Sequence, residues 1–268
     1  MATARINGID LSYRVEGAGP ILVWVSGTGM SGNAWHRFQV PHFRDRYTCV
    51  TYDLRGCGRS DCPDGEYSAK VMAADLLGLL DHLEIGSAHL AGFSLGSATI
   101  QEFALANPDR VRSATLISTW SSTAREHHIR RHYQSRVTAL EKGPMEVFRA
   151  FAFWMWAPSM VDEEYNRVTE LEEFFGSIAG ARDLRGYKGH FTADLAHETL
   201  DRLPQISCPV LVVYGAEDLV TRPEYNRRVA EAIPGAKTVE IPRGGHLALL
   251  EHPEAVNNAI DGFLGSLP

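Results

Sequence analysis

Short apolar runs alternate with helical segments along this chain, and this alternation limits the possible folds more than any other feature. The run ILVWV at 21–25 stops at a glycine-rich loop, which is typical of a strand buried on both faces of a sheet. Other strands are predicted at 2–6 and 10–16 around an Asn-Gly turn, and at 47–53, 87–91, 111–117, 209–214 and 237–241. Apolar residues at helical spacing predict helices at 68–83, 95–106, 222–233 and 253–264. This pattern indicates an α/β fold with a mostly parallel sheet and helices on both faces.

The alternation is interrupted by the block 121–203, in which we expect helices without clear strands. We therefore predict one α/β core, made of 1–120 and 204–268, and an inserted helical lid, 121–203, over the carboxyl ends of the strands. The lid is rich in aromatic residues. Four of them are too closely spaced to share one helix face, so some should face the sheet and others the surface. These four are Phe151, Phe153, Trp154 and Trp156.

The most informative motif is GFSLG at 92–96, which has the pattern Gly-x-Ser-x-Gly between a predicted strand and a predicted helix. A serine at the apex of such a sharp turn has a strained backbone, and the flanking glycines relieve the crowding around it. Its hydroxyl stands clear of the sheet, and the first N–H groups of the helix are unpaired. A chance glycine-rich turn would not explain the position between strand and helix. Ser94 is therefore the predicted nucleophile.

A serine hydroxyl needs a base to take its proton, and the base needs a carboxylate to hold its tautomer. His246 is the predicted base, because two glycines precede it and it lies between the last predicted strand and the closing helix. Asp218 is the predicted acid, because it comes soon after the strand at 209–214. The neighbouring Glu217 competes with it and is expected to be solvated. The chain order serine, aspartate, histidine is typical of one serine-hydrolase fold.

In these motifs and in others, the chain resembles the α/β-hydrolase superfamily along essentially its whole length. The matching stretches are VWVSGTG, YDLRGCGRSD, LAGFSLG, YGAEDLV and GGHLALLEHPEAV. Within the superfamily it is similar to the branch of 3-oxoadipate enol-lactonases, small carboxylesterases and cofactor-free haloperoxidases. The resemblance implies an eight-stranded sheet, no metal or other cofactor, and acyl transfer to water. A serine nucleophile argues against the haloalkane dehalogenase and epoxide hydrolase members, whose pattern has aspartate there.

The resemblance also implies an oxyanion hole of two backbone N–H groups. One belongs to the residue after the nucleophile, Leu95, and the other to the loop after the strand at 21–25. We assign the second to Thr28, with Gly29 as the alternative. Many members have His-Gly at the start of this loop, where this chain has Ser26-Gly27. The enol-lactonase group also lacks that histidine, which favours lactone chemistry, and backbone donors depend little on the side chain.

Substrate-binding residues are predicted from the aromatic side chains near the site. Trp120 follows the strand at 111–117 and is expected at the floor or wall of the pocket, while Phe151 and Trp154 of the lid are expected to line it. We assign Arg55 to a contact between loops in preference to a substrate carboxylate. Because burying an unpaired charge costs several kcal/mol, such a pocket favours a medium-sized, largely apolar substrate.

These residues predict a serine hydrolase that cleaves a carboxylic ester or lactone through an acyl-enzyme on Ser94. Two alternatives stay open. The same triad could hydrolyse a C–C bond of a β-diketone-like substrate, or the protein could be a ligand receptor of this fold with slow turnover. A receptor would show very slow or single-turnover hydrolysis and a ligand-dependent partner, whereas an enzyme would cycle freely.

Composition argues against several other classes of function. The formal net charge is −7, whereas nucleic-acid binding needs a surplus of clustered Lys and Arg. The basic run HHIRRH at 127–132 is interpreted as a solvated helix face. No segment approaches the roughly 18–20 apolar residues that span a bilayer, and no two-Cys, two-His zinc spacing appears. We expect a cytoplasmic protein that binds a small-molecule substrate and neither nucleic acid nor membrane, with its oligomeric state open.

Overall fold

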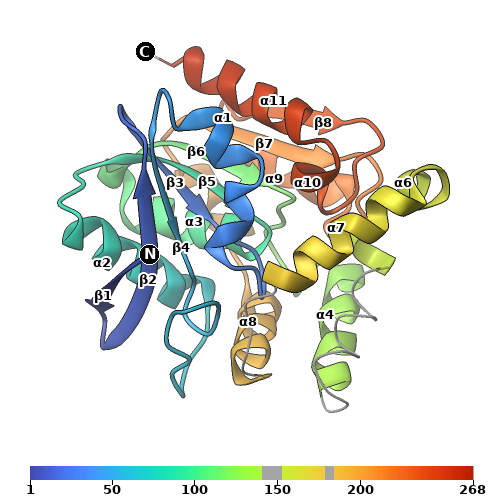
Figure 1. Cartoon of the computed structure of the whole chain (residues 1–268), viewed down its shortest axis with the longest axis horizontal. Helices are drawn as coiled ribbons and strands as arrows, with labels where there is room; N and C mark the ends of the chain where they lie inside the picture. The colour runs from blue at the N-terminus through green and yellow to red at the C-terminus, as the bar shows by residue number, and fades with distance from the viewer. Residues whose placement is uncertain (141–152, 179–183, 268) are drawn as a thin grey trace.

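The computed structural model describes residues 1–140, 153–178 and 184–267. An eight-stranded sheet runs through the molecule in the order β1-β2-β4-β3-β5-β6-β7-β8 (Figure 1). Strand β2 pairs antiparallel with β1 and β4, and the other neighbours are parallel, so the expected mostly parallel sheet is confirmed. The strands are β1 (Ala2–Ile6), β2 (Ile9–Glu16), β3 (Ile21–Val25), β4 (Thr48–Tyr52), β5 (Ala88–Phe93), β6 (Val111–Ile117), β7 (Val210–Gly215) and β8 (Lys237–Ile241).

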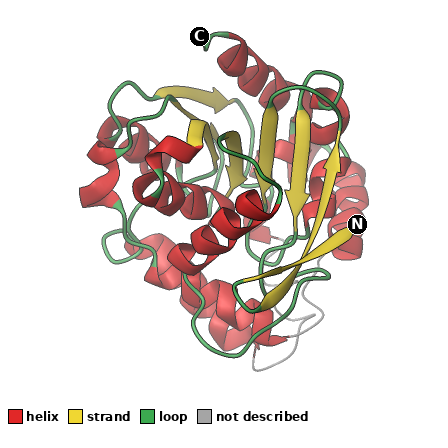
Figure 2. Cartoon of the chain, turned by 90° about the vertical axis from the view of Figure 1, so that its left-hand side faces the viewer, coloured by secondary structure: helices red, strands yellow, loops and turns green. Residues whose placement is uncertain are grey.

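Helices cover both faces of the sheet, as Figure 2 shows by the red helices on either side of the yellow strands. Side chains of β3 alternate between the two layers, because successive residues of a strand point to opposite faces. Leu22 and Trp24 belong to one buried core, and Val23 and Val25 to the other. The first core is covered by α1 (Gln39–Phe43), α10 (Ala248–Glu251) and α11 (Pro253–Gly265). The second core is covered by α2 (Ala69–His82), α3 (Leu95–Ala106) and α9 (Pro223–Ala232).

Residues 121–203, called the insertion below, lie between β6 and β7 in the chain. Their described part forms α4 (His127–Leu140), α6 (Pro158–Glu163), α7 (Tyr165–Ile178), α8 (Leu184–Ala196) and the start of the 3-10 helix η3 (Leu200–Gln205). Helices α4 and α8 pack against one another and lie below the sheet in Figure 1. An isolated antiparallel bridge between Ser122 and Glu198 joins the two ends of the insertion. The division of the chain into core and lid domains stays a prediction.

The aromatic residues of the insertion are divided between solvent and interior. Phe153 is 70% exposed, whereas Trp156 is buried and donates its indole N–H to Glu172 Oε1 at 3.0 Å. Trp154 is half-buried. The expected division is confirmed for these three, and Phe151 lies outside the described residues.

The basic run at the start of α4 departs from its interpretation as a solvated face. His127, Arg130 and Arg131 are exposed, but His132 is buried, with its ring against Trp154 at 5.9 Å between centroids. The solvated-face interpretation is therefore wrong for His132, because α4 turns that residue toward neighbouring aromatic side chains.

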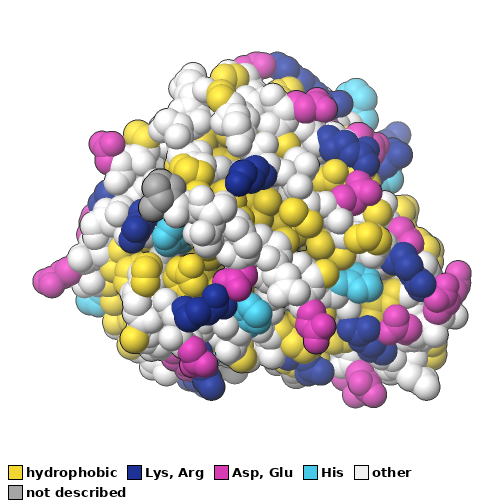
Figure 3. Space-filling model, turned by 90° about the horizontal axis from the view of Figure 1, so that it is seen from above, with side chains coloured by type: hydrophobic (Ala, Val, Ile, Leu, Met, Phe, Trp, Pro, Cys, Tyr) yellow, Lys and Arg dark blue, Asp and Glu magenta, His cyan; other side chains and the backbone are white. Residues whose placement is uncertain are grey.

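The surface seen from the side of α11 carries both kinds of charge. Figure 3 shows Lys and Arg side chains interspersed with Asp and Glu on this face, in keeping with 26 basic and 33 acidic residues in the chain. Within the described ranges, no helix combines the length and apolar character needed to cross a bilayer.

Candidate active site

Ser94 occupies a sharp turn between β5 and α3. Its φ is 52° and its ψ is −118°, a conformation that a residue with a side chain rarely adopts. The neighbouring glycines allow the turn, since a Cβ on Gly92 would lie 2.5 Å from the carbonyl oxygen of Gly96. A Cβ on Gly96 would lie 2.1 Å from the carbonyl oxygen of Val25. The motif therefore brings α3 against β3 and β5 and leaves Ser94 at the junction.

His246 links Ser94 to Asp218. Its Nε2 lies 3.2 Å from the Ser94 Oγ, and its Nδ1 lies 2.9 Å from the Asp218 Oδ2. All three side chains are buried. A carboxylate accepts only, so the network assigns the ring proton to Nδ1 and leaves Nε2 as the acceptor for the serine hydroxyl. The three residues that sequence analysis selected are thus within hydrogen-bonding reach of one another.

The competing acid, Glu217, faces away from this network. Its Oε2 accepts the backbone N–H of Ser159 at 2.9 Å, in the first turn of α6. It is half-buried, so the expectation that it is solvated holds only in part. A carboxylate near a helix N-terminus satisfies an otherwise unpaired N–H group, which explains its position.

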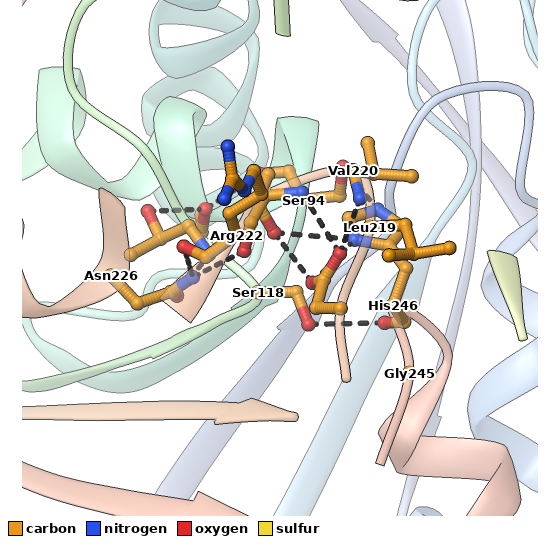
Figure 4. Close-up of polar contacts among 12 residues, drawn as sticks. Ser94, Ser118, Leu219, Val220, Arg222, Asn226, Gly245 and His246 are labelled. Carbon is orange, nitrogen blue, oxygen red and sulfur yellow. Dashed lines mark hydrogen bonds and ion pairs between the residues drawn. The ribbon is translucent and has the colours of Figure 1, made fainter. Parts of the chain in front are cut away.

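Two buried polar residues hold the loops that carry the histidine and the acid (Figure 4). Ser118, just after β6, donates its hydroxyl to the carbonyl oxygen of His246 at 3.0 Å. Asn226 of α9 accepts the N–H of Thr119 at 2.7 Å and donates to the carbonyl oxygen of Thr221 at 2.7 Å. The end of β6 is thereby connected to both loops, and no sequence motif pointed to either residue.

Glu251 connects the histidine loop to the insertion. It is buried on α10, and its carboxyl accepts the backbone N–H groups of Gly245 and Ala157. Burial raises the pKa of Glu251 to about 7, although both hydrogen bonds oppose the rise. The N–H of Leu247 also donates to the carbonyl oxygen of Met155 at 3.0 Å. The position of His246 is therefore coupled to residues 155–157.

The two candidate amides of the oxyanion hole differ in their availability. The N–H of Gly29 donates to His190 Nδ1 at 3.0 Å, so it is already used. Within the described residues, the N–H groups of Thr28 and Leu95 have no acceptor. Leu95 is the first residue of α3, where the helix itself provides no acceptor for the N–H. The geometry therefore favours Thr28 over Gly29.

A small cavity lies at the nucleophile. It is lined by Thr28, Phe93, Ser94, Tyr133, Met155, Val220 and His246. The wall position expected for Trp120 belongs to Tyr133, because Trp120 is fully buried behind it, at 5.8 Å between ring centroids, and donates its indole N–H to Thr123. Trp154 lies next to Met155 in the chain and packs on His128 and His132.

Tyr133 could have been found from the periodicity of α4. Four of its five buried residues, Ile129, Tyr133, Arg136 and Leu140, recur at spacings of three and four, but one of the four is an arginine and other charged residues lie between them, which hid the pattern. Burial raises the pKa of Tyr133 well above its ordinary value, and the Asp194 carboxyl adds to the rise. The wall of the cavity is thus a neutral phenol.

Two arginines that could bind a substrate carboxylate, Arg55 and Arg125, are paired with acids elsewhere. Arg55 forms two hydrogen bonds with Asp75, at 2.6 and 2.8 Å, and Arg125 pairs with Asp201 on the surface. Arg55 therefore makes a structural contact, as expected, but the contact joins its loop to helix α2 and not to another loop. No group of three potential metal ligands occurs among the residues that the structure describes.

Comparison with known proteins agrees with this architecture. A model of the alpha/beta hydrolase family matches residues 22–259. A putative non-heme bromoperoxidase of Mycobacterium tuberculosis is 32% identical over 97% of this chain and 99% of its own length. A putative carbamate hydrolase of Azorhizobium caulinodans is 29% identical over 100% of this chain and 99% of its own length. The crystal structure of an enol-lactonase from Burkholderia xenovorans has a TM-score of 0.87 and 27% identity, covering 99% of this chain and 100% of that one.

Proposed function

Because this chain belongs to the alpha/beta hydrolase family, we propose that it is a serine hydrolase that cleaves a carboxylic ester or lactone of a medium-sized, largely apolar molecule. The observation that carries the proposal is the continuous contact from Ser94 through His246 to Asp218, with 3.2 and 2.9 Å between the bonded atoms. The likeness to an enol-lactonase structure supports the lactone branch of the proposal.

In the proposed reaction, the Ser94 Oγ attacks the carbonyl carbon while His246 Nε2 takes the serine proton. Asp218 stabilises the imidazolium that forms. The N–H groups of Thr28 and Leu95 donate to the oxygen that becomes negative. Collapse of the tetrahedral intermediate breaks the bond to the leaving oxygen, which receives the proton from His246. Water then attacks the acyl-enzyme with the same base, releasing the acid and restoring the serine.

The lining of the cavity supports an apolar substrate. Phe93, Met155 and Val220 present hydrocarbon or thioether surface beside Ser94, and the arginines Arg55 and Arg125 are engaged by acids elsewhere. A substrate carboxylate in this cavity would lose its hydration without gaining either of those arginines as a partner, which is costly.

Turnover on a matched panel tests the proposal. Neutral esters and lactones should be hydrolysed over many cycles, with kcat/KM above that of carboxylate-bearing analogues of equal size. Ser94→Ala should stay folded by circular dichroism and lose about a millionfold in kcat. Near-normal turnover by Ser94→Ala would contradict the mechanism, and preference for the charged series would contradict the apolar cavity. Cleavage of β-diketones alone would move the proposal to C–C hydrolysis, and a single turnover would favour a receptor.

A further inference from the structure

Helix α8 of the insertion contacts the loop that supplies one oxyanion donor. We call residues 26–29 the oxyanion loop. His190 and Asp194 of α8 are four residues apart and therefore lie on one face of the helix. Both are buried, and each hydrogen-bonds to the oxyanion loop. Neither contact is needed for the hydrogen bonds that link Ser94, His246 and Asp218, so the two contacts need their own explanation.

His190 fixes the backbone of the loop. Its Nδ1 accepts the N–H of Gly29 at 3.0 Å, and its Nε2 lies 2.7 Å from the carbonyl oxygen of Arg55. An amide N–H can only donate and a carbonyl can only accept, so the ring carries its proton on Nε2. Burial lowers the pKa of His190 to about 4, which keeps the ring neutral at neutral pH. Both ring nitrogens therefore hold the backbone in one arrangement.

Asp194 fixes the side chain of the residue that we assign to the oxyanion hole. Its Oδ2 accepts the hydroxyl of Thr28 at 2.7 Å. Burial raises the pKa of Asp194 well above its ordinary value, with the hydrogen bond from Thr28 opposing the rise. This hydrogen bond ties the Thr28 side chain to α8.

Two glycines allow α8 to approach this closely. Gly29 has a φ of 67°, and a Cβ there would lie 2.2 Å from the ring of Tyr187. A Cβ on Gly186 would lie 1.9 Å from the carbonyl oxygen of Gly56. The backbone of α8 at Gly186 thus lies directly against the backbone at Gly56, and the Tyr187 ring of α8 lies directly against the oxyanion loop at Gly29.

We propose that His190 and Asp194 are positioning residues for the oxyanion hole: they hold residues 26–29 so that the N–H of Thr28 stays beside Ser94 while that of Gly29 is withdrawn. The inference rests on the proposed function. It gives the insertion a part in the chemical step in addition to covering the site. We call the contacts of His190 and Asp194 with the oxyanion loop the clamp. Because the Thr28 N–H stabilises the charge of the transition state, loss of the clamp should lower kcat more than it raises KM.

Two pairs of variants test the clamp. His190→Phe removes both ring nitrogens, while His190→Gln keeps one acceptor and one donor. Asp194→Leu removes the acceptor for Thr28, while Asp194→Asn keeps one. We expect the first member of each pair to lower kcat by about 100-fold, the scale of one lost oxyanion donor, with KM changed less than about threefold. His190→Gln and Asp194→Asn should each have a kcat at least about tenfold higher than His190→Phe and Asp194→Leu, respectively.

A matched control is His89, a buried histidine near the start of β5 whose pKa burial also lowers to about 4. His89→Phe should lower thermal stability and leave kcat unchanged. A trifluoromethyl ketone, which forms a tetrahedral oxyanion on the serine, should bind His190→Phe more weakly by the same factor as kcat/KM falls. Binding of the product acid should stay within about threefold, because it makes no transition-state contact.

Amide hydrogen exchange gives a readout without turnover. Exchange of residues 26–29 should be faster in His190→Phe than in the wild type and in His89→Phe. Wild-type kcat in a folded His190→Phe, no recovery by His190→Gln, or unchanged exchange would each overturn the clamp. Absence of Ser94-dependent turnover in the wild type would instead overturn the proposed function, and exchange would still decide whether His190 orders the loop.

Discussion

Asp218 accepts hydrogen bonds at both of its carboxylate oxygens from more than one group. Its Oδ1 receives the N–H groups of Val220 and Thr221 at 2.8 and 2.9 Å. Its Oδ2 receives the Thr221 hydroxyl at 2.8 Å and lies 2.9 Å from the His246 ring. A carboxylate has about four acceptor positions, so this one is fully used. An amide at this position would place its own N–H groups against donors.

Asp218→Asn should therefore lower kcat by about 10,000-fold, because the amide favours the wrong tautomer of His246. Glu217→Gln is the matched control, since it neutralises a neighbouring carboxylate that accepts the N–H of Ser159. It should change kcat by less than about tenfold. Ester hydrolysis is measured for both, with circular dichroism to verify folding. Greater damage in Glu217→Gln would mean that the acid is assigned to the wrong residue.

Residues of the site differ in how far the sequence reveals them. Ser94, Asp218 and His246 each come shortly after the end of a predicted strand, so local pattern was sufficient to select them. His190 and Asp194 contact the oxyanion loop across 161 and 166 residues of chain, and no local spacing encodes such a contact. Trp120 was selected for its size and position, but the tertiary packing of α4 puts Tyr133 in front of it.

Among the elements, α8 depends on a close backbone approach that only glycine permits. A Cβ on Gly186 would lie 1.9 Å from the carbonyl oxygen of Gly56, too close for any adjustment of a side chain to relieve. Gly262 provides the contrast, because it also lies inside a helix, α11, yet a Cβ there meets nothing within 4 Å. The same substitution at the two sites separates packing from helix propensity.

Gly186→Ala should lower the free energy of unfolding by about 1–3 kcal/mol, the usual cost of overpacking, and should lower kcat as α8 moves away from the oxyanion loop. Gly262→Ala should raise the free energy of unfolding by about 0.5–1 kcal/mol, since alanine restricts the unfolded chain and favours the helix. Urea unfolding and ester hydrolysis measure both effects. Equal stabilisation by the two substitutions would mean that α8 does not pack as tightly as the structure indicates.

The regular elements of the core were predictable and the short ones were not. The predicted bounds of β3, α3, β6 and β8 agree with the structure. Strands β3 and β6 are buried and α3 has several turns, so each carries a full hydrophobic period, whereas β8 is largely exposed. Helices α1 and α10 were missed, since five and four residues are too few to show one. Strand β5 continues to Phe93, two residues beyond the prediction.

In the molecule as a whole, buried ionisable groups couple stability to pH in two opposing ways. Burial raises the pKa of Glu126 to about 8 and of Glu251 to about 7, and that of Asp194 well above its ordinary value. Folding favours the protonated form of each acid. Their contribution to stability is complete below their ordinary values, 4.5 for glutamate and 3.8 for aspartate, and is lost as pH rises through the raised values.

Buried histidines act in the opposite direction. Burial lowers the pKa of His89, His190 and His197 to about 4, and that of His132 well below its ordinary value. Folding favours their neutral form, so their contribution is complete above 6.5 and is lost as pH falls toward 4. Between pH 4.5 and 6.5 the contributions of these acids and of these histidines to stability change in opposite directions. Above pH 6.5 the acids, but not the histidines, still change protonation.

The free energy of unfolding should therefore fall as pH rises from 6.5 to 8, and Glu126 should account for much of the fall. Its side chain is fully buried, while its partner Arg228 lies at 3.3 Å and is 43% exposed, so water screens the attraction. Glu126→Gln should flatten the pH dependence by up to about 1.4 kcal/mol per pH unit, the value of one proton. Urea unfolding of both proteins at pH 6.5, 7.2 and 8 (about 0.75 units apart) measures this slope.

Glu231→Gln, on an exposed position of α9, is the control and should leave the slope unchanged. Equal slopes in the wild type and Glu126→Gln would show that the Glu126 carboxyl is already ionised in the folded protein at pH 6.5.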